Sequence, residues 1–220
     1  MAARKTGAVL LFDDFETLDA FGPVEVLGSI PGLELKYWSL DRNNSKALHR
    51  FGGNREESRD EIDLKVQSVH GVKVYTEPIP EEVSDLFFVL LPGGRGTREK
   101  IDDNEFLCSI KRVTRSAEYV LSVCTGSALL AAAGLLDGRR ATSNNKAFEW
   151  VASQSGDVDW QPESRWVVDH TLYTSSGVSA GIDMSLAFVR DVYGSDQARD
   201  IADSIEYVWN NDPDYNPFRI

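Results

Sequence analysis

The sequence predicts an α/β fold with a mostly parallel sheet and helices on both faces. Residues 7–12 and 86–91 are apolar throughout, as expected of parallel strands that are covered on both sides. Segments of helical periodicity alternate with these strands. A third apolar strand, at residues 119–123, runs into a small-residue helix through a sharp turn at Cys124. These three observations favour an open α/β sheet.

The first half of the chain begins with a β-α-β unit and then becomes polar. The expected elements, in order, are a strand at 7–12, a helix through 23–28, an alternating strand at 33–40, a solvated insertion at about 41–67, a strand pair or turn at 69–75, and a buried strand at 86–91. The helix stops because Pro31-Gly32 follows it. The insertion is assigned because its charged, Asn- and Gly-containing sequence has too little apolar surface to pack.

The second half continues the alternation of strands and helices. The expected elements are an amphipathic helix at 104–118, the strand 119–123, an alanine-rich helix at 128–133, a short strand within 138–142, a hairpin at 166–174, and helices at 182–193 and 195–209. The hairpin is predicted because Asp169-His170-Thr171 separates two short apolar strands. We expect one domain spanning residues 1–220, and no internal repeat is visible.

Composition restricts the class of partner. The formal charge of −12 and the isoelectric point near 4.7 argue against nucleic acid and anionic membranes as partners. Small neutral or cationic substrates remain open. Cys108 and Cys124 are the two cysteines and lack metal-site spacing, so we expect neither a disulfide nor a metal site. Because the cysteines suggest no disulfide framework, a reducing compartment fits best. No stretch could span a bilayer and the N-terminal apolar run is too short for a signal peptide, so we expect a cytoplasmic location.

Cys124 is the strongest candidate for a catalytic residue. It stands between a strand and a helix, in the position that a nucleophile elbow gives to its serine or cysteine, and Gly126 keeps this turn open. The unpaired N–H groups of the helix start are expected to lower the pKa of such a thiol. The alternative is a buried, inert cysteine.

Three loops should meet at the carboxyl ends of the strands, where ligands bind in such folds. One carries Glu16 and Asp19, one carries Gly93 and Gly94, and one is the Cys124 elbow. The amides of Gly93 and Gly94 could form an anion or oxyanion pocket, although a plain turn is an equal alternative.

The chain resembles the DJ-1/PfpI (ThiJ) superfamily and, within it, the isocyanide hydratase branch. The resemblance covers roughly residues 8–40 and 69–218 and rests on the following segments: Leu18-Asp19 with Gly22-Pro23, Pro92-Gly93-Gly94-Arg95-Gly96, Ser122-Val123-Cys124-Thr125-Gly126-Ser127, Arg140-Ala141-Thr142 and Ala180-Gly181-Ile182-Asp183. It implies a flavodoxin-like three-layer sandwich, a homodimer, a small-molecule substrate and no cofactor or metal.

The resemblance also assigns the partner of Cys124. The family pairs its cysteine with an acid four residues before a proline, which here is Asp19 before Pro23. Glu16 is then a solvated neighbour. The alternative for Asp19 is an acid that stabilises the start of a helix. Thr125, the next residue after Cys124, is expected to support the site through its amide and hydroxyl.

A catalytic histidine is missing from the expected place. Many relatives have a histidine beyond the elbow helix, where this chain has Asn144, and an amide cannot exchange a proton near neutral pH. His49, His70 and His170 lie in polar or turn segments that do not point to Cys124. A Cys-His protease or amidotransferase mechanism is therefore disfavoured.

Hydration of an isocyanide suits the remaining groups, because its terminal carbon accepts a nucleophile and its nitrogen takes up a proton. Cys124 would form a thioimidate and Asp19 would act as acid and base, giving its first proton to nitrogen. The alternatives are an oxidative-stress sensor based on Cys124, a glyoxalase III-like aldehyde-handling enzyme, and a ligand-binding domain such as those of transcription regulators.

Overall fold

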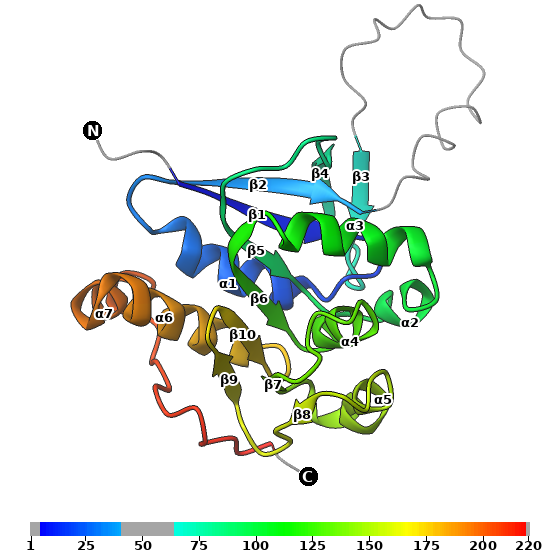
Figure 1. The fold of residues 1–220 in the computed structure, drawn as a ribbon. Helices are drawn as coiled ribbons and strands as arrows, with labels where there is room; N and C mark the ends of the chain where they lie inside the picture. The colour runs from blue at the N-terminus through cyan, green and yellow to red at the C-terminus, as the bar shows by residue number, and fades with distance from the viewer. Residues whose placement is uncertain (1–4, 41–63, 219–220) are drawn as a thin grey trace, which may run out of the picture.

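An eight-stranded sheet forms the centre of the protein (Figure 1). The structure is a computed structural model that describes residues 5–40 and 64–218. The strand order is β3-β4-β2-β1-β5-β6-β10-β9, and β7 and β8 form a separate pair. The strands are β1 (Lys5–Leu11), β2 (Leu33–Ser39), β3 (Leu64–Gln67), β4 (Lys73–Pro78), β5 (Leu86–Leu91), β6 (Ala117–Val123), β7 (Arg140–Ala141), β8 (Asp159–Trp160), β9 (Trp166–Asp169) and β10 (Leu172–Ser175).

Helices cover both faces of this sheet. They are α1 (Thr17–Gly28), α2 (Thr97–Lys100), α3 (Asn104–Thr114), α4 (Gly126–Ala132), α5 (Phe148–Ala152), α6 (Ala180–Tyr193) and α7 (Ser195–Ser204), with a 3₁₀ turn η2 (Asn145–Ala147). Helix α6 packs against α1 and α7 on one face, and α4 packs against α2 and α3 on the other (Figure 1). The three-layer, flavodoxin-like α/β sandwich predicted from the sequence is confirmed.

The strand order places the candidate residues at one edge of the sheet. Strand β1 pairs in parallel with β2 on one side and with β5 on the other, and β5 pairs in parallel with β6. The chain leaves β1 toward β2 and later returns to β5, so the loops after β1 and β5 diverge at this point. Asp19, Gly93 and Cys124 follow the carboxyl ends of β1, β5 and β6, respectively.

Several predicted boundaries were wrong. Helix α1 begins at Thr17, before the predicted segment 23–28, and β4 ends at Pro78, three residues after the predicted strand pair or turn at 69–75. The last four residues assigned to the insertion form β3, whose Leu64 and Val66 are buried in alternation with polar neighbours; the rest of the insertion, residues 41–63, lies outside the described residues. Helix α3 ends at Thr114, four residues early, because Ala117 already pairs with Leu86 of β5. Helix α7 ends at Ser204 rather than 209.

The end of α7 has a local cause. Glu206 adopts a left-handed φ of 52°, and the amide of Tyr207 donates to the carbonyl of Ala202 at 2.9 Å. This hydrogen-bond arrangement terminates helices and satisfies their last carbonyl groups. The short elements α2, α5 and β8 were not predicted, because their few residues show no clear periodicity. In the described ranges, no helix combines the length and apolar character needed to span a bilayer.

A buried ion pair attaches the C-terminal segment to α6. Arg165 Nε donates to Asp183 Oδ2 at 2.7 Å, and both side chains are almost completely buried. The Tyr207 hydroxyl and the Asn210 amide donate to Asp183 Oδ1 at 3.2 and 3.0 Å, respectively. The Arg165 amide donates to the carbonyl of Pro213 at 2.7 Å. These contacts hold residues 207–213 against α6.

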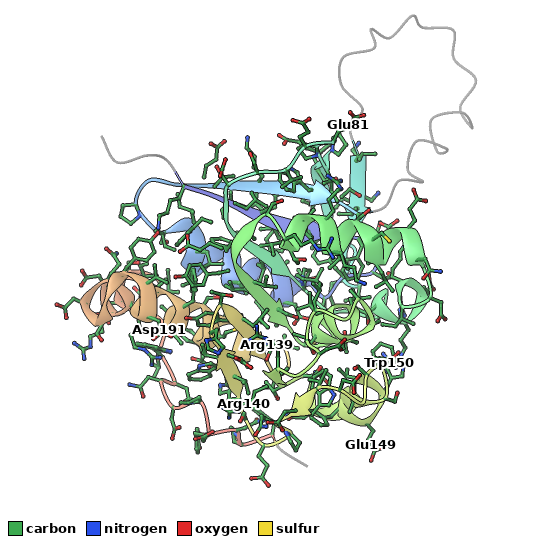
Figure 2. All side chains as sticks on the ribbon, in the orientation of Figure 1. Glu81, Arg139, Arg140, Glu149, Trp150 and Asp191 are labelled. Atoms are coloured by element: carbon green, nitrogen blue, oxygen red, sulfur yellow. The ribbon has the colours of Figure 1, made fainter. Side chains whose placement is uncertain are left out.

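Arg165→Met is therefore expected to lower the free energy of unfolding by about 3–5 kcal/mol, because the buried Asp183 carboxylate would lose its counter-charge. Urea denaturation measures this loss. The matched control is Arg190→Met, which breaks a 2.8 Å pair with Asp191 at the partly exposed surface (Asp191 is labelled in Figure 2) and should cost less than about 1 kcal/mol. Equal losses in the two variants would contradict a special role for the buried pair.

Candidate active site

The backbone at Cys124 is strained in the way that a nucleophile elbow requires. Cys124 has a φ of 58°, a left-handed conformation that non-glycine residues rarely adopt. Its amide donates to the carbonyl of Ser175 at 3.1 Å, and its carbonyl accepts from the hydroxyls of Ser143 at 2.8 Å and Ser127 at 3.0 Å. A Cβ at position 126 would lie 2.6 Å from the carbonyl oxygen of Leu91, so Gly126 does keep the turn open.

Asp19 lies on α1 and is completely buried. Its Oδ2 accepts a hydrogen bond of 3.1 Å from the Gly93 amide. Its Oδ1 has no conventional hydrogen-bond partner among the described residues. The Cys124 thiol interacts with this carboxyl and lowers its pKa, which we interpret as a weak sulfur contact rather than a well-aligned hydrogen bond. The side chain that the family motif selects thus faces the elbow.

Burial controls the protonation of Asp19. Loss of solvation raises its pKa from 3.8 to about 7, and the negative charge of Glu16 adds to the rise. The Cys124 thiol and the amides of Gly93 and Val178 act in the opposite direction. The alternative of an acid that only stabilises the helix start does not describe this group, because such an acid would be ionised and solvated.

The expectation of a low thiol pKa was wrong. Burial raises the pKa of Cys124 well above its ordinary value, and the negative charge of Asp19 raises it further. The amide and hydroxyl of Thr125 oppose this rise but do not reverse it. Two anions in this buried space would repel each other strongly, so Asp19 and Cys124 share a proton over a wide range of pH.

Gly93 and Gly94 position other groups of the site. The Gly93 amide donates to Asp19, and the Gly94 amide donates to Thr125 Oγ1 at 3.0 Å. Because both amides already have acceptors in the protein, the predicted oxyanion pocket is not supported. Position 93 requires glycine because a side chain would clash there: a Cβ would lie 2.5 Å from the Thr125 amide nitrogen and 3.0 Å from Asp19 Oδ2.

Thr125 connects the elbow to the loop after β5. Its hydroxyl accepts from Gly94 and lies 3.1 Å from the hydroxyl of Thr97, the first residue of α2. Its amide and hydroxyl also interact with the sulfur of Cys124 and lower the thiol pKa. The predicted contact between Thr125 and the nucleophile is therefore present.

None of the described histidines lies at the elbow. Asn144, at the family histidine position, caps η2 by accepting from the Ala147 amide at 3.1 Å. His170 lies at the tip of the β9–β10 hairpin, where its Nε2 is 3.6 Å from Asp169. His70 lies beside Glu16, and His49 is outside the described residues. Among the described residues, the titratable side chain that interacts with Cys124 is therefore the Asp19 carboxyl and not an imidazole.

Two further groups act on the Asp19 carboxyl. Glu16 is not a solvated neighbour: its side chain is only 22% exposed, and its charge acts on Asp19. Val178, with a strained φ of 49°, brings its amide to the Asp19 carboxyl. The Glu16-Thr17 pair close to Asp19 was a sequence signal for Glu16, whereas no sequence signal identified Val178.

An aromatic contact joins helices α2 and α5. Trp150 projects from α5 (Figure 2), and the guanidinium carbon of Arg98 on α2 lies 4.5 Å from the centre of its ring. This cation–π distance is favourable. Within residues 5–40 and 64–218, no group of three or more His, Cys, Asp or Glu side chains is placed to hold a metal ion.

Comparison with known proteins agrees with the fold. The family model described as DJ-1/PfpI family matches residues 5–191. An isonitrile hydratase of Pseudomonas putida is 31% identical over 90% of this chain and 77% of its own length. A deglycase of Thermococcus kodakarensis is 27% identical over 72% of this chain and 86% of its own. The crystal structure of a ThiJ/PfpI family protein from Pseudomonas syringae superposes with a TM-score of 0.73, at 26% identity, over 97% of this chain and 78% of that one. The chain belongs to the DJ-1/PfpI family.

Proposed function

We propose that this protein hydrates an isocyanide, also called an isonitrile, to an N-substituted formamide. The observation that carries the proposal is the buried Asp19 carboxyl, with a pKa of about 7, beside the Cys124 thiol. This pair supplies a nucleophile and a proton carrier without an imidazole. The similarity to an isonitrile hydratase supports the same reaction.

The first half of the reaction forms a covalent intermediate. Because burial keeps the thiol protonated, the Asp19 carboxylate removes its proton as sulfur bonds to the terminal carbon of R–N≡C. Asp19 then gives this proton to the same carbon. The product is the thioimidate R–N=CH–S–Cys124. In this thioimidate the added hydrogen is on carbon. The first proton from Asp19 therefore goes to carbon, and not to nitrogen as the sequence-based mechanism had it.

The second half consumes water. Asp19 removes a proton from a water molecule whose oxygen adds to the thioimidate carbon, and the nitrogen receives this proton. The C–S bond of the adduct then breaks, the sulfur regains a proton from the new hydroxyl through Asp19, and R–NH–CHO leaves. One hydrogen of water ends on nitrogen and the other on Cys124, so the enzyme returns to its starting state.

This mechanism predicts the pH dependence of the reaction. Below about pH 7 Asp19 holds its own proton and cannot accept that of the thiol, so kcat/KM should rise about tenfold per pH unit and level off above about 7. The raised pKa of Cys124 keeps the second proton on the pair at higher pH. Initial rates in a series of constant-ionic-strength buffers measure the profile. A rate that falls as pH increases through 7 would contradict the assignment.

A direct assay tests the function. A small panel of alkyl and aryl isocyanides is incubated with the protein, and formamide is quantified by chromatography. We expect enzyme-dependent formamide from at least one member. Parallel assays with methylglyoxal and with mild peroxide test the aldehyde-handling and sensor alternatives. The sensor alternative is less favoured, because a thiol of raised pKa has little of the thiolate that peroxide oxidises.

The proposal includes the remaining expectations about the molecule. We propose one domain over residues 1–220, a small-molecule substrate, no resident cofactor, a cytoplasmic location and a homodimer. Sedimentation equilibrium would test the last of these: a mass of 24.5 kDa, that of one chain, would exclude the dimer under the assay conditions.

A further inference from the structure

The turn between β3 and β4 docks on the segment between β1 and α1, shortly before Asp19. Phe15 and Ser68 form a β-bridge, and the Val69 amide donates to the carbonyl of Phe15 at 2.9 Å. One residue before, the Asp14 amide donates to the carbonyl of Gln67 at 2.8 Å. These main-chain bonds fix the position of the turn relative to the start of α1.

The turn places His70 against Glu16. His70 Nδ1 lies 3.4 Å from Glu16 Oε1 and 3.0 Å from Thr17 Oγ1. The Thr17 hydroxyl donates its own proton to Ser68 Oγ at 2.8 Å. His70 Nδ1 therefore acts as the donor at this contact, and its proton faces the oxygens of Thr17 and Glu16.

Glu16 is connected in turn to Asp19. The Glu16 amide donates to the carbonyl of Gly93 at 2.8 Å, and the Gly93 amide donates to Asp19 Oδ2. Glu16 is the N-cap of α1 and Asp19 lies three residues later in its first turn, a spacing that places side chains on the same side of a helix. The side chains of His70 and Glu16 are 65% and 22% exposed, and Asp19 is 0% exposed. The three groups therefore extend from solvent to the buried site.

We propose that Glu16 and His70 are positioning residues for the acid–base group. Glu16 sets the pH at which the Asp19–Cys124 pair loses the first of its two protons, and His70 limits the effect of Glu16 by facing its carboxylate. The role in turnover rests on the proposed hydratase function. Neither side chain contacts the sulfur, so both act through the charge that Asp19 experiences. Glu16 is, after burial, the largest contribution to the raised pKa of Asp19.

Among the charged groups around this site, Glu16 is the one whose charge we expect to change the titration of Asp19 most. The Asp14 carboxylate lies 3.3 Å from the guanidinium of Arg95, a residue of the loop after β5. The Asp13 carboxylate accepts a hydrogen bond from the Gln67 amide at 2.9 Å. The elbow contributes Cys124. The segment 176–178 contains no titratable side chain, and between Ser68 and Val72 His70 is the only one.

The test is a titration of the Asp19 carboxyl in the full-length protein, with no substrate. Aspartate is labelled with carbon-13 at Cγ, and the Asp19 resonance is identified as the one missing from Asp19→Asn. We expect Glu16→Gln to lower the midpoint of its titration by about one pH unit, as one nearby charge does to a buried carboxyl. His70→Lys, which places a permanent cation beside Glu16, should also lower the midpoint.

Two controls separate this role from a structural one. His170→Lys changes the matched histidine, which lies beside Asp169 on a different hairpin, and should leave the Asp19 midpoint unchanged. In a Glu16→Gln background, His70→Lys should have a smaller effect than in the native chain. An unchanged midpoint in a folded Glu16→Gln variant would overturn the inference, and so would equal shifts with His70→Lys and His170→Lys.

The rate profile distinguishes this inference from the proposed function. If the protein hydrates isocyanides, the rising limb of kcat/KM should move to lower pH in Glu16→Gln by the same amount as the carbon-13 midpoint. If it does not hydrate them, the carbon-13 midpoints still decide whether Glu16 and His70 act on Asp19. A shifted midpoint with an unshifted rate profile would remove the pair from the reaction.

Discussion

Replacing Cys124 by serine is expected to reduce turnover of an isocyanide by at least about 10³-fold. A serine hydroxyl is a weaker acid and a much weaker nucleophile than a thiol at the same position, so Asp19, with a pKa of about 7, generates the attacking group less readily. The fold should persist, because serine is slightly smaller and keeps the amide and carbonyl bonds that hold the left-handed elbow. Formamide production at saturating substrate measures the loss.

The second cysteine provides the matched control. Cys108 is exposed on α3, away from the elbow, so Cys108→Ser should retain native activity. Intact-mass spectrometry after acid quenching adds a second readout. The native protein and Cys108→Ser should carry the mass of one isocyanide during turnover, and Cys124→Ser should carry none. Native activity in Cys124→Ser would exclude covalent catalysis at this residue.

The fold could be predicted wherever burial leaves a strong sequence signal. Residues 7–11 of β1 and all of β5 are buried and form unbroken apolar runs, and their parallel pairing follows from the helices between strands. Strand β3 shows the opposite case. Only Leu64 and Val66 are buried in it, and it is a strand because it pairs with β4. The short sequence among charged residues does not reveal this pairing.

The sequence predicted which residues form the site but not the pKa of the Cys124 thiol. The motif located Asp19 and Cys124, and the elbow conformation follows from the abrupt change from strand to helix. The pKa of the thiol was predicted in the wrong direction because the helix start was the only effect visible in the sequence. Burial outweighs it here, and burial depends on how the loops after β1, β5 and β6 close over the sulfur.

The raised pKa of Asp19 affects the stability of the folded protein as well as the proposed reaction. An unfolded aspartate is ionised above about pH 4, whereas folded Asp19 keeps its proton up to about pH 7. Between these values the folded state binds a proton that the unfolded state lacks, so the contribution of Asp19 to stability falls as pH rises through this window. Above pH 7 the folded protein carries the full cost of a buried carboxylate, on the order of 2–4 kcal/mol.

Asp19→Asn should therefore inactivate the enzyme and stabilise it. An asparagine oxygen can still accept from the Gly93 amide, but the amide cannot carry a proton between sulfur and substrate. Thermal or urea denaturation at pH 8 should show a gain of roughly 2–4 kcal/mol that disappears near pH 3.5, where aspartate is protonated in both states. Asp14→Asn is the matched control, because asparagine tolerates the φ of 60° at this exposed position and little stability should change. A variant that is less stable than the native protein at pH 8, or that still makes formamide, would show that Asp19 is not the buried proton carrier of this site.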